Sequence, residues 1–448
     1  LQRVVAEAKS KAVRWNGATQ LAVLYAATGR TRLAEAEFQR ALDTVEEARG
    51  DVGQEEMRMT FASTVSGFYG QYVDFLVDSD RAIEALRVTE LSRARTLAEG
   101  LGFDANVLGS FDPMRTARDR HATLLVYRFG PERSYLWAVT ADGVSLYKLP
   151  PAVELNGDLE AYSRELVGPR PEMSGRGERL FNTLVMPAAK QLPPNGRVVV
   201  IPDGRLNAFN IETLVVLTPK RHYWIEDVTV ETAASLTLAG RLRTPASGSG
   251  RLLIVGDPVT RDQSYPPLPH ARAEMARITA RFARATVLAG SSATPDAYLR
   301  SSPGSYDFLH FVAHGTASIR RPLDSAVVLS HDEHGYKLYA REIVLHPLKA
   351  KLVTISSCHG AGIRAYAGEG LIGLAWAFLR AGAHQVVAAL WEINDSATPE
   401  LMDRMYEGIR AGRDTATALR EAKLALIRSG SIYRRPLYWA PFVLYSGS

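Results

Sequence analysis

The pattern of hydrophobic and polar positions divides the chain into two parts. Up to about residue 102, apolar positions recur at spacings of three and four with few β-branched runs, which predicts amphipathic helices. From about residue 111 onward, short and wholly apolar runs bounded by turn residues alternate with helical patterns. Such runs are typical of buried parallel strands covered by helices on both faces. We therefore predict an all-helical start followed by an α/β part.

The helical start contains a repeat. The stretch ATQLAVLYAATGRTRLAEAEFQRAL matches a tetratricopeptide unit, a helix–turn–helix whose small residues let two helices approach closely, at Leu21, Ala22, Tyr25, Gly29, Ala34, Phe38 and Ala41. A second, degenerate helix pair covers about 54–77 and 80–100. Since about three repeats are usually needed for a stable array, we expect this part to pack on the rest of the chain or to continue upstream.

The α/β part shows strands and one hairpin. The runs ATLLVYRFG and SYLWAVTADGVSLYKLP predict antiparallel strands around the Asp142–Gly143 turn. Later runs, among them GRVVVIPDG, RLLIVGDPV, YDFLHFVAHG, KLVTISSCHG and HQVVAALWEIND, predict parallel strands. The linker-like stretch RLRTPASGSG marks a seam. We predict a helical region over 1–110 and two α/β halves over 111–250 and 251–448.

Composition excludes several classes of protein. The chain has 448 residues, more than the 250–300 or so that one core usually organises, with 46% hydrophobic and 23% charged residues, as in folded globular proteins. The net charge of +5 is spread among interspersed acids and bases, which argues against direct nucleic-acid binding. The most apolar segment, 371–391, contains Arg380 and His384, and the amphipathic first residues do not resemble a signal peptide. A single cysteine cannot form an internal disulfide. We expect a cytoplasmic protein without membrane contact.

Two predicted strands end in reactive residues. The run DFLHFVAHG ends at His314 and Gly315, and KLVTISSCHG reaches Cys358 after a further 44 residues. Ligands collect at the carboxyl ends of strands in open α/β sheets. If the two strands are neighbours, an imidazole and a thiol share one cleft, which is the arrangement that nucleophilic catalysis needs. A glycine after the histidine lets a substrate carbonyl approach the main chain.

Other interpretations compete with a catalytic pair. A lone cysteine is often a small buried hydrophobe, and a strand-end histidine is often structural. Several histidines crowd the region, but His310 and His314 would lie about 13 Å apart in an extended strand, too far to share one metal ion. The stretch GEGLIG matches a dinucleotide-binding pattern, but it begins some ten residues after the strand end. We expect neither metal nor cofactor.

With His314–Gly315, Cys358 and the tail GEGLIGLAWAFLRAGAHQVVAALWEINDSAT in view, the sequence resembles CHAT proteins. These are caspase-like cysteine peptidases of clan CD from bacteria, related to separase and more distantly to caspases and gingipains, and often fused to tetratricopeptide repeats. The resemblance covers about 111–446, including VVVIPDGRLNAFNIETL and PLYWAPFVLYSG. It implies an α/β caspase-like fold in which an inactive half, 111–250, precedes an active protease half, 251–448.

The resemblance also implies roles for individual residues. His314 would be the general base, Cys358 the nucleophile, and the amides of Gly315 and Cys358 the oxyanion hole. In separase-like enzymes a Trp-Asp-x-x-Asp stretch lines the pocket for a basic P1 side chain, and WEIND stands there in this chain. Asp395 is the main candidate for that pocket, with Glu369 and Asp324 as weaker ones. The alternative for Asp395 is a cap on the helix that starts near Ser396.

We interpret the sequence as a cysteine endopeptidase that cuts a protein substrate after Arg or Lys without metal or cofactor. The helical region is a plausible receiver of a regulatory protein partner, because caspase-like enzymes are often held inactive until their loops are ordered. The family suggests roles in defence or cell-death signalling. The competing hypothesis is a non-catalytic interaction protein with an inert caspase-like platform.

Overall fold

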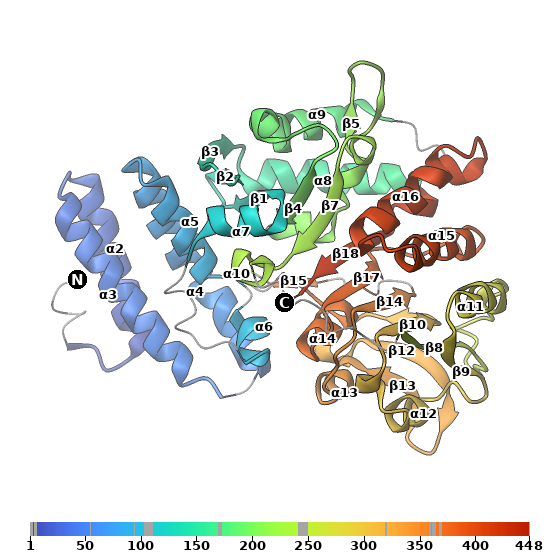
Figure 1. Cartoon of the computed structure of the whole chain (residues 1–448). Helices are drawn as coiled ribbons and strands as arrows, with labels where there is room; N and C mark the ends of the chain where they lie inside the picture. The colour runs from blue at the N-terminus through green and yellow to red at the C-terminus, as the bar shows by residue number, and fades with distance from the viewer. Residues whose placement is uncertain are drawn as a thin grey trace.

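A helical N-terminal region lies beside a large sheet that helices cover on both faces (Figure 1). The structure is a computed structural model. It describes residues 3, 7–53, 55–93, 95–102, 111–168, 173–240, 250–318, 320–357, 360, 364–366 and 370–447. This arrangement confirms the predicted order of an all-helical start and an α/β part.

The helical region begins with the predicted antiparallel pair. Its helices are α2 (Lys11–Ala27), α3 (Thr31–Gly50), α4 (Glu55–Asp78), α5 (Ala82–Leu91) and α6 (Arg95–Gly100). Between α2 and α3, Gly29 has a positive φ of 74°, a conformation that glycine adopts without steric cost. One expectation was wrong, because the helix predicted over about 80–100 is divided into α5 and α6.

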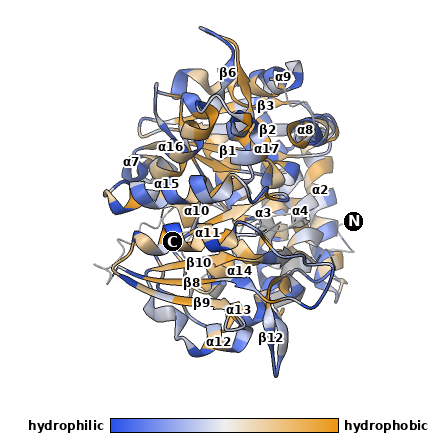
Figure 2. Cartoon of the chain, turned by 90° about the vertical axis from the view of Figure 1, so that its right-hand side faces the viewer, coloured by the Kyte–Doolittle hydropathy of each residue, from blue (hydrophilic) through white to orange (hydrophobic). Residues whose placement is uncertain are grey.

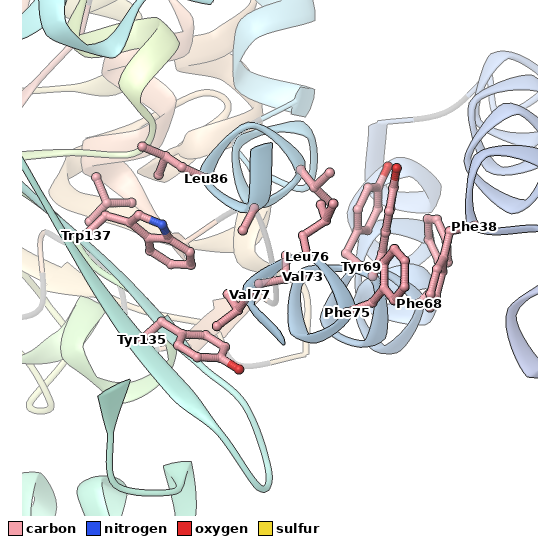
Figure 3. Close-up of a cluster of buried hydrophobic side chains, with 14 of the residues drawn as sticks. Phe38, Phe68, Tyr69, Val73, Phe75, Leu76, Val77, Leu86, Tyr135 and Trp137 are labelled. Carbon is pink, nitrogen blue, oxygen red and sulfur yellow. The ribbon is translucent and has the colours of Figure 1, made fainter. Parts of the chain in front are cut away.

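The helical region shares a hydrophobic core with the sheet. Figure 3 shows Leu86 of α5 beside the indole of Trp137, which comes from strand β2 (Ser134–Val139), and Val77 of α4 near the ring of Tyr135. The indole Nε1 of Trp137 donates a hydrogen bond to the Ala82 carbonyl at 2.9 Å. The Tyr135 hydroxyl donates to Asp74 at 2.7 Å. The expectation that the helical region packs on the rest of the chain is therefore confirmed.

One sheet of eleven strands runs through both halves of the α/β part. Its order is β3 (Val144–Leu149), β2, β1 (Ala122–Phe129), β4 (Arg197–Ile201), β7 (Thr229–Ala233), β18 (Phe442–Ser446), β17 (Gln385–Ala389), β14 (Leu352–Ser356), β10 (Phe308–Val312), β8 (Arg251–Pro258) and β9 (Arg284–Gly290). The predicted hairpin around Asp142–Gly143 joins β2 and β3, which pair antiparallel.

The last strand of the chain joins the two halves. β18 pairs parallel with β7 and antiparallel with β17. As a result, the parallel strands β1, β4, β7 and β18 run opposite to the parallel set from β17 to β9. The carboxyl ends of the two sets therefore point to opposite edges of the sheet. The predicted seam at 241–250 lies almost wholly outside the described residues, so the domain boundary there stays a prediction.

Helices bury the two faces of the C-terminal half of the sheet in separate cores. One face packs against α11 (Ala271–Ala280), α15 (Thr398–Arg410) and α16 (Thr415–Ile427). The other packs against α12 (Pro295–Arg300), α13 (Ala340–Val344) and α14 (Leu374–Arg380). Figure 2 shows the strands between these layers largely in hydrophobic colours. The Thr294 hydroxyl caps the start of α12, because it accepts a hydrogen bond from the amide of Ala297 at 3.1 Å.

We predict that Leu86→Ala lowers the free energy of unfolding by about 2–5 kcal/mol, because it leaves a cavity beside Trp137 in the shared core. The matched control is Ile83→Ala on the same helix, since Ile83 is 48% exposed whereas Leu86 is fully buried. Urea denaturation followed by tryptophan fluorescence measures both changes. Equal, small effects of the two substitutions would contradict the shared core.

Candidate active site

The strands that lead to the two candidate catalytic residues are neighbours. β10 and β14 pair in parallel with Val312 opposite Ser356. His314 lies two residues after Val312, and Cys358 lies two residues after Ser356. The condition on which the sequence argument depends, that the two strands lie side by side, is thus confirmed.

His314 is held by a small sheet beside the main one. After β10 the chain bends at Ala313 and continues as β11 (His314–Thr316), which pairs antiparallel with β12 (Ala326–Asp332). His314 lies opposite Val328 and Gly315 opposite Val327. A third strand, β13 (Gly335–Tyr339), completes this sheet. The ladder fixes the backbone of the histidine at the carboxyl end of β10.

A backbone carbonyl orients the imidazole of His314. Its Nε2 lies 2.6 Å from the carbonyl oxygen of Pro266, and its ring centroid is 5.8 Å from that of Tyr265. A carbonyl oxygen can only accept, so Nε2 carries the proton of the neutral ring. Nδ1 is then the unprotonated nitrogen that can take a proton from an attacking group. This partner could not be predicted from the sequence, because a backbone carbonyl is present at every residue and produces no side-chain pattern.

The loop that supplies this carbonyl is itself fixed. It covers 259–270, directly after β8. The amide of Val259 donates to the Ser330 hydroxyl in β12 at 2.8 Å, and the Thr260 hydroxyl donates to the carbonyl of Tyr265 at 2.6 Å. The imidazole of His314 is therefore oriented by a loop that is bonded to the same small sheet as its own strand.

A buried polar network ties β10 to β14 below the site. His310 of β10 and Thr354 of β14 are register partners, and the hydroxyl of Tyr406 lies 3.1 Å from His310 Nδ1 and 2.9 Å from Thr354 Oγ1. His310 Nε2 lies 2.8 Å from a carboxylate oxygen of Glu274. All four side chains are buried, so each depends on the others for its hydrogen bonds. His310 thus has a structural role.

Cys358, His359 and Glu369 lie outside the described residues, and the structure does not describe their positions. The chain on either side is described. The buried hydroxyls of Ser356 and Ser357 find no hydrogen-bond partner within the described residues. At Gly360 a Cβ atom would lie 2.8 Å from Cγ2 of Ile355, so a larger side chain would force the strand end apart. Among the described residues, Gly360 thus packs closely against Ile355.

The segment that follows Cys358 reaches the helical region. The strands β15 (Arg364–Tyr366) and β16 (Gly370–Ile372) form an antiparallel hairpin that leads into α14. Both strands contact the short helix η3 (Gly204–Ala208), which follows β4, and β15 also contacts α4. In Figure 1, β15 lies between the helical region and the sheet. The described strands that follow Cys358 in the chain are therefore in contact with the N-terminal helices.

The candidates for a substrate pocket differ in their partners. Asp395 accepts a hydrogen bond from the amide of His270 at 3.3 Å, so it lies at the end of the same loop that orients His314. It does not cap the following helix, because α15 begins at Thr398 and has no side-chain cap. Asp324 forms an ion pair with Arg341, which already compensates its charge. Their roles in substrate binding, like those of Gly315 and Glu369, stay predictions.

Within the described residues, no group of three or more His, Cys, Asp or Glu side chains could hold a metal ion. Within the same residues no helix is both long and apolar enough to cross a membrane.

Comparisons with known proteins agree with this geometry. Residues 175–447 match the protein family described as CHAT domain. Tetratricopeptide repeat protein 28 of Mus musculus is 34% identical over 107 residues, which are 24% of this chain and 4% of that protein. The human protein of the same name is 31% identical over 107 residues. These relatives fit the repeat pattern of the helical region, although the match spans only a small part of their length.

Two solved structures have the same fold. The separase of Saccharomyces cerevisiae, in a complex with securin, superposes with a TM-score of 0.58 and 9% identity over 92% of this chain and 37% of that one. A second structure of the complex gives a TM-score of 0.54 with 11% identity over 93% and 37% of the two chains. At this identity the likeness concerns the fold. The predicted separase-like, caspase-like architecture is confirmed.

We predict that Tyr406→Phe lowers the free energy of unfolding by about 1–3 kcal/mol, because it leaves His310 and Thr354 with unsatisfied buried polar atoms. The control is Tyr298→Phe. Tyr298 is also fully buried, but its hydroxyl has no partner within the described residues, so its loss costs little. Urea denaturation of both variants measures the difference. If Tyr298→Phe destabilises as much as Tyr406→Phe, the network does not hold the two strands together.

Proposed function

We propose, from the premise that this chain belongs to the CHAT domain family, that it is a cysteine endopeptidase with His314 as general base and Cys358 as nucleophile. The observation that carries the proposal is the parallel pairing of β10 and β14, whose ends lead to these two residues. A caspase-like fold and an oriented imidazole support it further.

The proposed reaction uses a thiolate and one imidazole. Nδ1 of His314 takes the proton of the Cys358 thiol, and the sulfur attacks the scissile carbonyl. The amides of Gly315 and Cys358 hold the oxyanion that forms. The protonated imidazole then gives its proton to the leaving amine, which releases the first product and leaves a thioester. Water, deprotonated by the same imidazole, hydrolyses the thioester. The Pro266 carbonyl accepts from Nε2 in both the neutral and the protonated ring, so that Nδ1 is the nitrogen that takes and returns the proton.

The proposed cleavage site follows a basic residue. Asp395 is half-buried and sits at the end of the loop that orients His314. One of its carboxylate oxygens accepts from the His270 amide, and no other hydrogen bond to this side chain occurs within the described residues. A carboxylate held in a partly closed site is a suitable partner for the guanidinium of a P1 arginine or the ammonium of a P1 lysine.

The helical region is the proposed receiver of a regulatory protein partner. The hairpin β15–β16, which follows Cys358 in the chain, contacts α4 and η3. A partner that shifts α4 would therefore act directly on the segment that carries the nucleophile. In this proposal the protein works in the cytoplasm of a bacterial cell, where a reduced thiol persists.

We predict that Cys358→Ala or His314→Ala lowers proteolysis of the natural protein substrate by about 10³-fold or more, because each removes one half of the catalytic pair. The control His334→Ala, at an exposed histidine outside this pair, keeps wild-type activity. Mass-spectrometric comparison of proteins cleaved by wild type and by Cys358→Ala identifies the substrate. Labelling with a thiol-reactive peptidyl electrophile gives a second readout. A chain that stays unlabelled, with and without partner proteins, is a scaffold.

We predict that peptides with Arg or Lys at P1 are cleaved in preference to those with Asp or Leu. Asp395→Asn then lowers kcat/KM for the Arg peptide by about tenfold or more, since the charge-assisted contact is worth roughly 1.5–3 kcal/mol. The control is Glu333→Gln, at an exposed carboxylate outside the predicted pocket. A preference for Asp or Leu at P1, or equal effects of the two substitutions, would rule out Asp395 as the partner of a basic P1 side chain. Neither result would bear on the proposed catalytic pair.

A further inference from the structure

A cleft of about 370 Å³ lies between the helical region and the inactive half. Helix α4 forms one wall, and the segments that follow β1 and β4 form the other. The volume falls within the range of about 300–1000 Å³ that is common for small-molecule sites. Because the carboxyl ends of the two halves point to opposite edges of the sheet, this cleft is distinct from the end of β10 that bears His314.

Arg128 is the cation of this cleft that has no matching anion. Its Nη2 reaches the Ser66 carbonyl at 3.5 Å, and no carboxylate lies within ion-pair distance of it among the described residues. The other two arginines of the cleft are satisfied. Arg93 donates to the carbonyls of Tyr127, Ile201 and Pro202, and Arg133 pairs with Asp78 at 2.7 Å. Burial lowers the pKa of Arg128, which indicates that the neighbouring groups do not fully compensate the charge of its guanidinium.

The two carboxylates of the cleft are occupied by other groups. Asp203 accepts from the amides of Phe129 at 2.7 Å and Gly204 at 2.9 Å. Asp74 accepts from the Tyr135 hydroxyl at 2.7 Å, and burial raises the pKa of Asp74 above its usual value. Neither offers its charge to Arg128 at hydrogen-bond distance. The cleft therefore keeps one guanidinium that an oxyanion would satisfy.

The wall formed by α4 is kept open by two glycines inside a helix. Glycine in a helix interior costs about 1 kcal/mol relative to alanine. At Gly70 a Cβ would lie 2.8 Å from Nη2 of Arg128, so a larger side chain there would displace the end of the guanidinium. At Gly67 a Cβ would meet nothing within 4 Å, so packing does not require glycine there. Both positions line the cleft and leave room for a ligand.

We propose that this cleft is an effector site for a small molecule that bears a carboxylate or a phosphate. The oxyanion pairs with the guanidinium of Arg128, and the apolar body of the ligand packs against Phe129 and Pro131, which also line the cleft. The ligand lies between α4 and Asp203, after which η3 begins. Since α4 and η3 both contact the β15–β16 hairpin, an occupied cleft restrains the segment that follows Cys358. The regulatory effect of the ligand rests on the proposed function, whereas its binding to the cleft does not.

Isothermal titration of the full-length protein with phenyl phosphate, benzoate and inorganic phosphate tests binding. We expect saturable binding of at least one of the ring-bearing anions, and the stronger of the two shows whether the site takes a phosphate or a carboxylate. Phenol, the uncharged control, does not bind. Arg128→Met weakens binding at least tenfold, and Gly67→Leu, which fills the cleft without a clash at Cβ, does the same. The control Arg118→Gln, at an exposed arginine outside the cleft, binds as wild type.

Hydrogen exchange with and without the bound anion tests the connection to the hairpin. We expect slower exchange in α4 and in the strands β15 and β16 on binding, and no change in Gly67→Leu. The proposal is overturned if no probe binds saturably, or if Arg128→Met and Gly67→Leu bind as wild type. It is also overturned if binding leaves the exchange of β15 and β16 unchanged. Ligand binding does not require Cys358. The test therefore gives a clear result even if the protein has no peptidase activity.

Discussion

The parallel pairing of β10 with β14 is the constraint on which the rest of this structure depends. A strand that slips by one residue turns every side chain to the opposite face of the sheet, so the site exists only in one register. Within the two strands that register is fixed by Tyr406, whose hydroxyl bridges His310 and Thr354 across the pair. At the carboxyl end of β10 the chain is held by the small sheet that begins at His314. The imidazole is thus positioned by buried polar atoms and by backbone ladders, which together leave its Nδ1 available.

The helical region belongs to the same folded unit as the sheet. Its core is continuous with β2 through Trp137, and its longest described helix, α4, contacts the hairpin that follows Cys358 in the chain. The same helix forms one wall of the cleft that contains Arg128. A partner on the outer helices and a ligand in the cleft would therefore act on one element. Under the proposed function, a distant event would thus have two routes to the segment that follows Cys358, and neither needs a contact at the sheet edge that bears His314.

Much of the fold follows from the sequence, because hydrophobic period and turn chemistry are local. The tetratricopeptide-like pair, the hairpin at Asp142–Gly143 and the strand ends shortly before His314 and Cys358 could all be predicted in this way. Other features depend on contacts between distant segments. The insertion of β18 between the two halves, the orientation of His314 by a backbone carbonyl and the bond from Asp395 to His270 leave no local pattern. The break between α5 and α6 was missed because the helical period continues through it.

The central claim is that His314 acts on the thiol of Cys358. Cys358 is the only cysteine of the chain, so the rate of alkylation by iodoacetamide reports on this thiol alone. The measurement is that rate as a function of pH, in wild type and in His314→Ala. The account predicts that the wild-type thiol reacts well below the usual thiol pKa of about 8.5, and that His314→Ala moves the midpoint up toward that value. Identical profiles for the two proteins would contradict it.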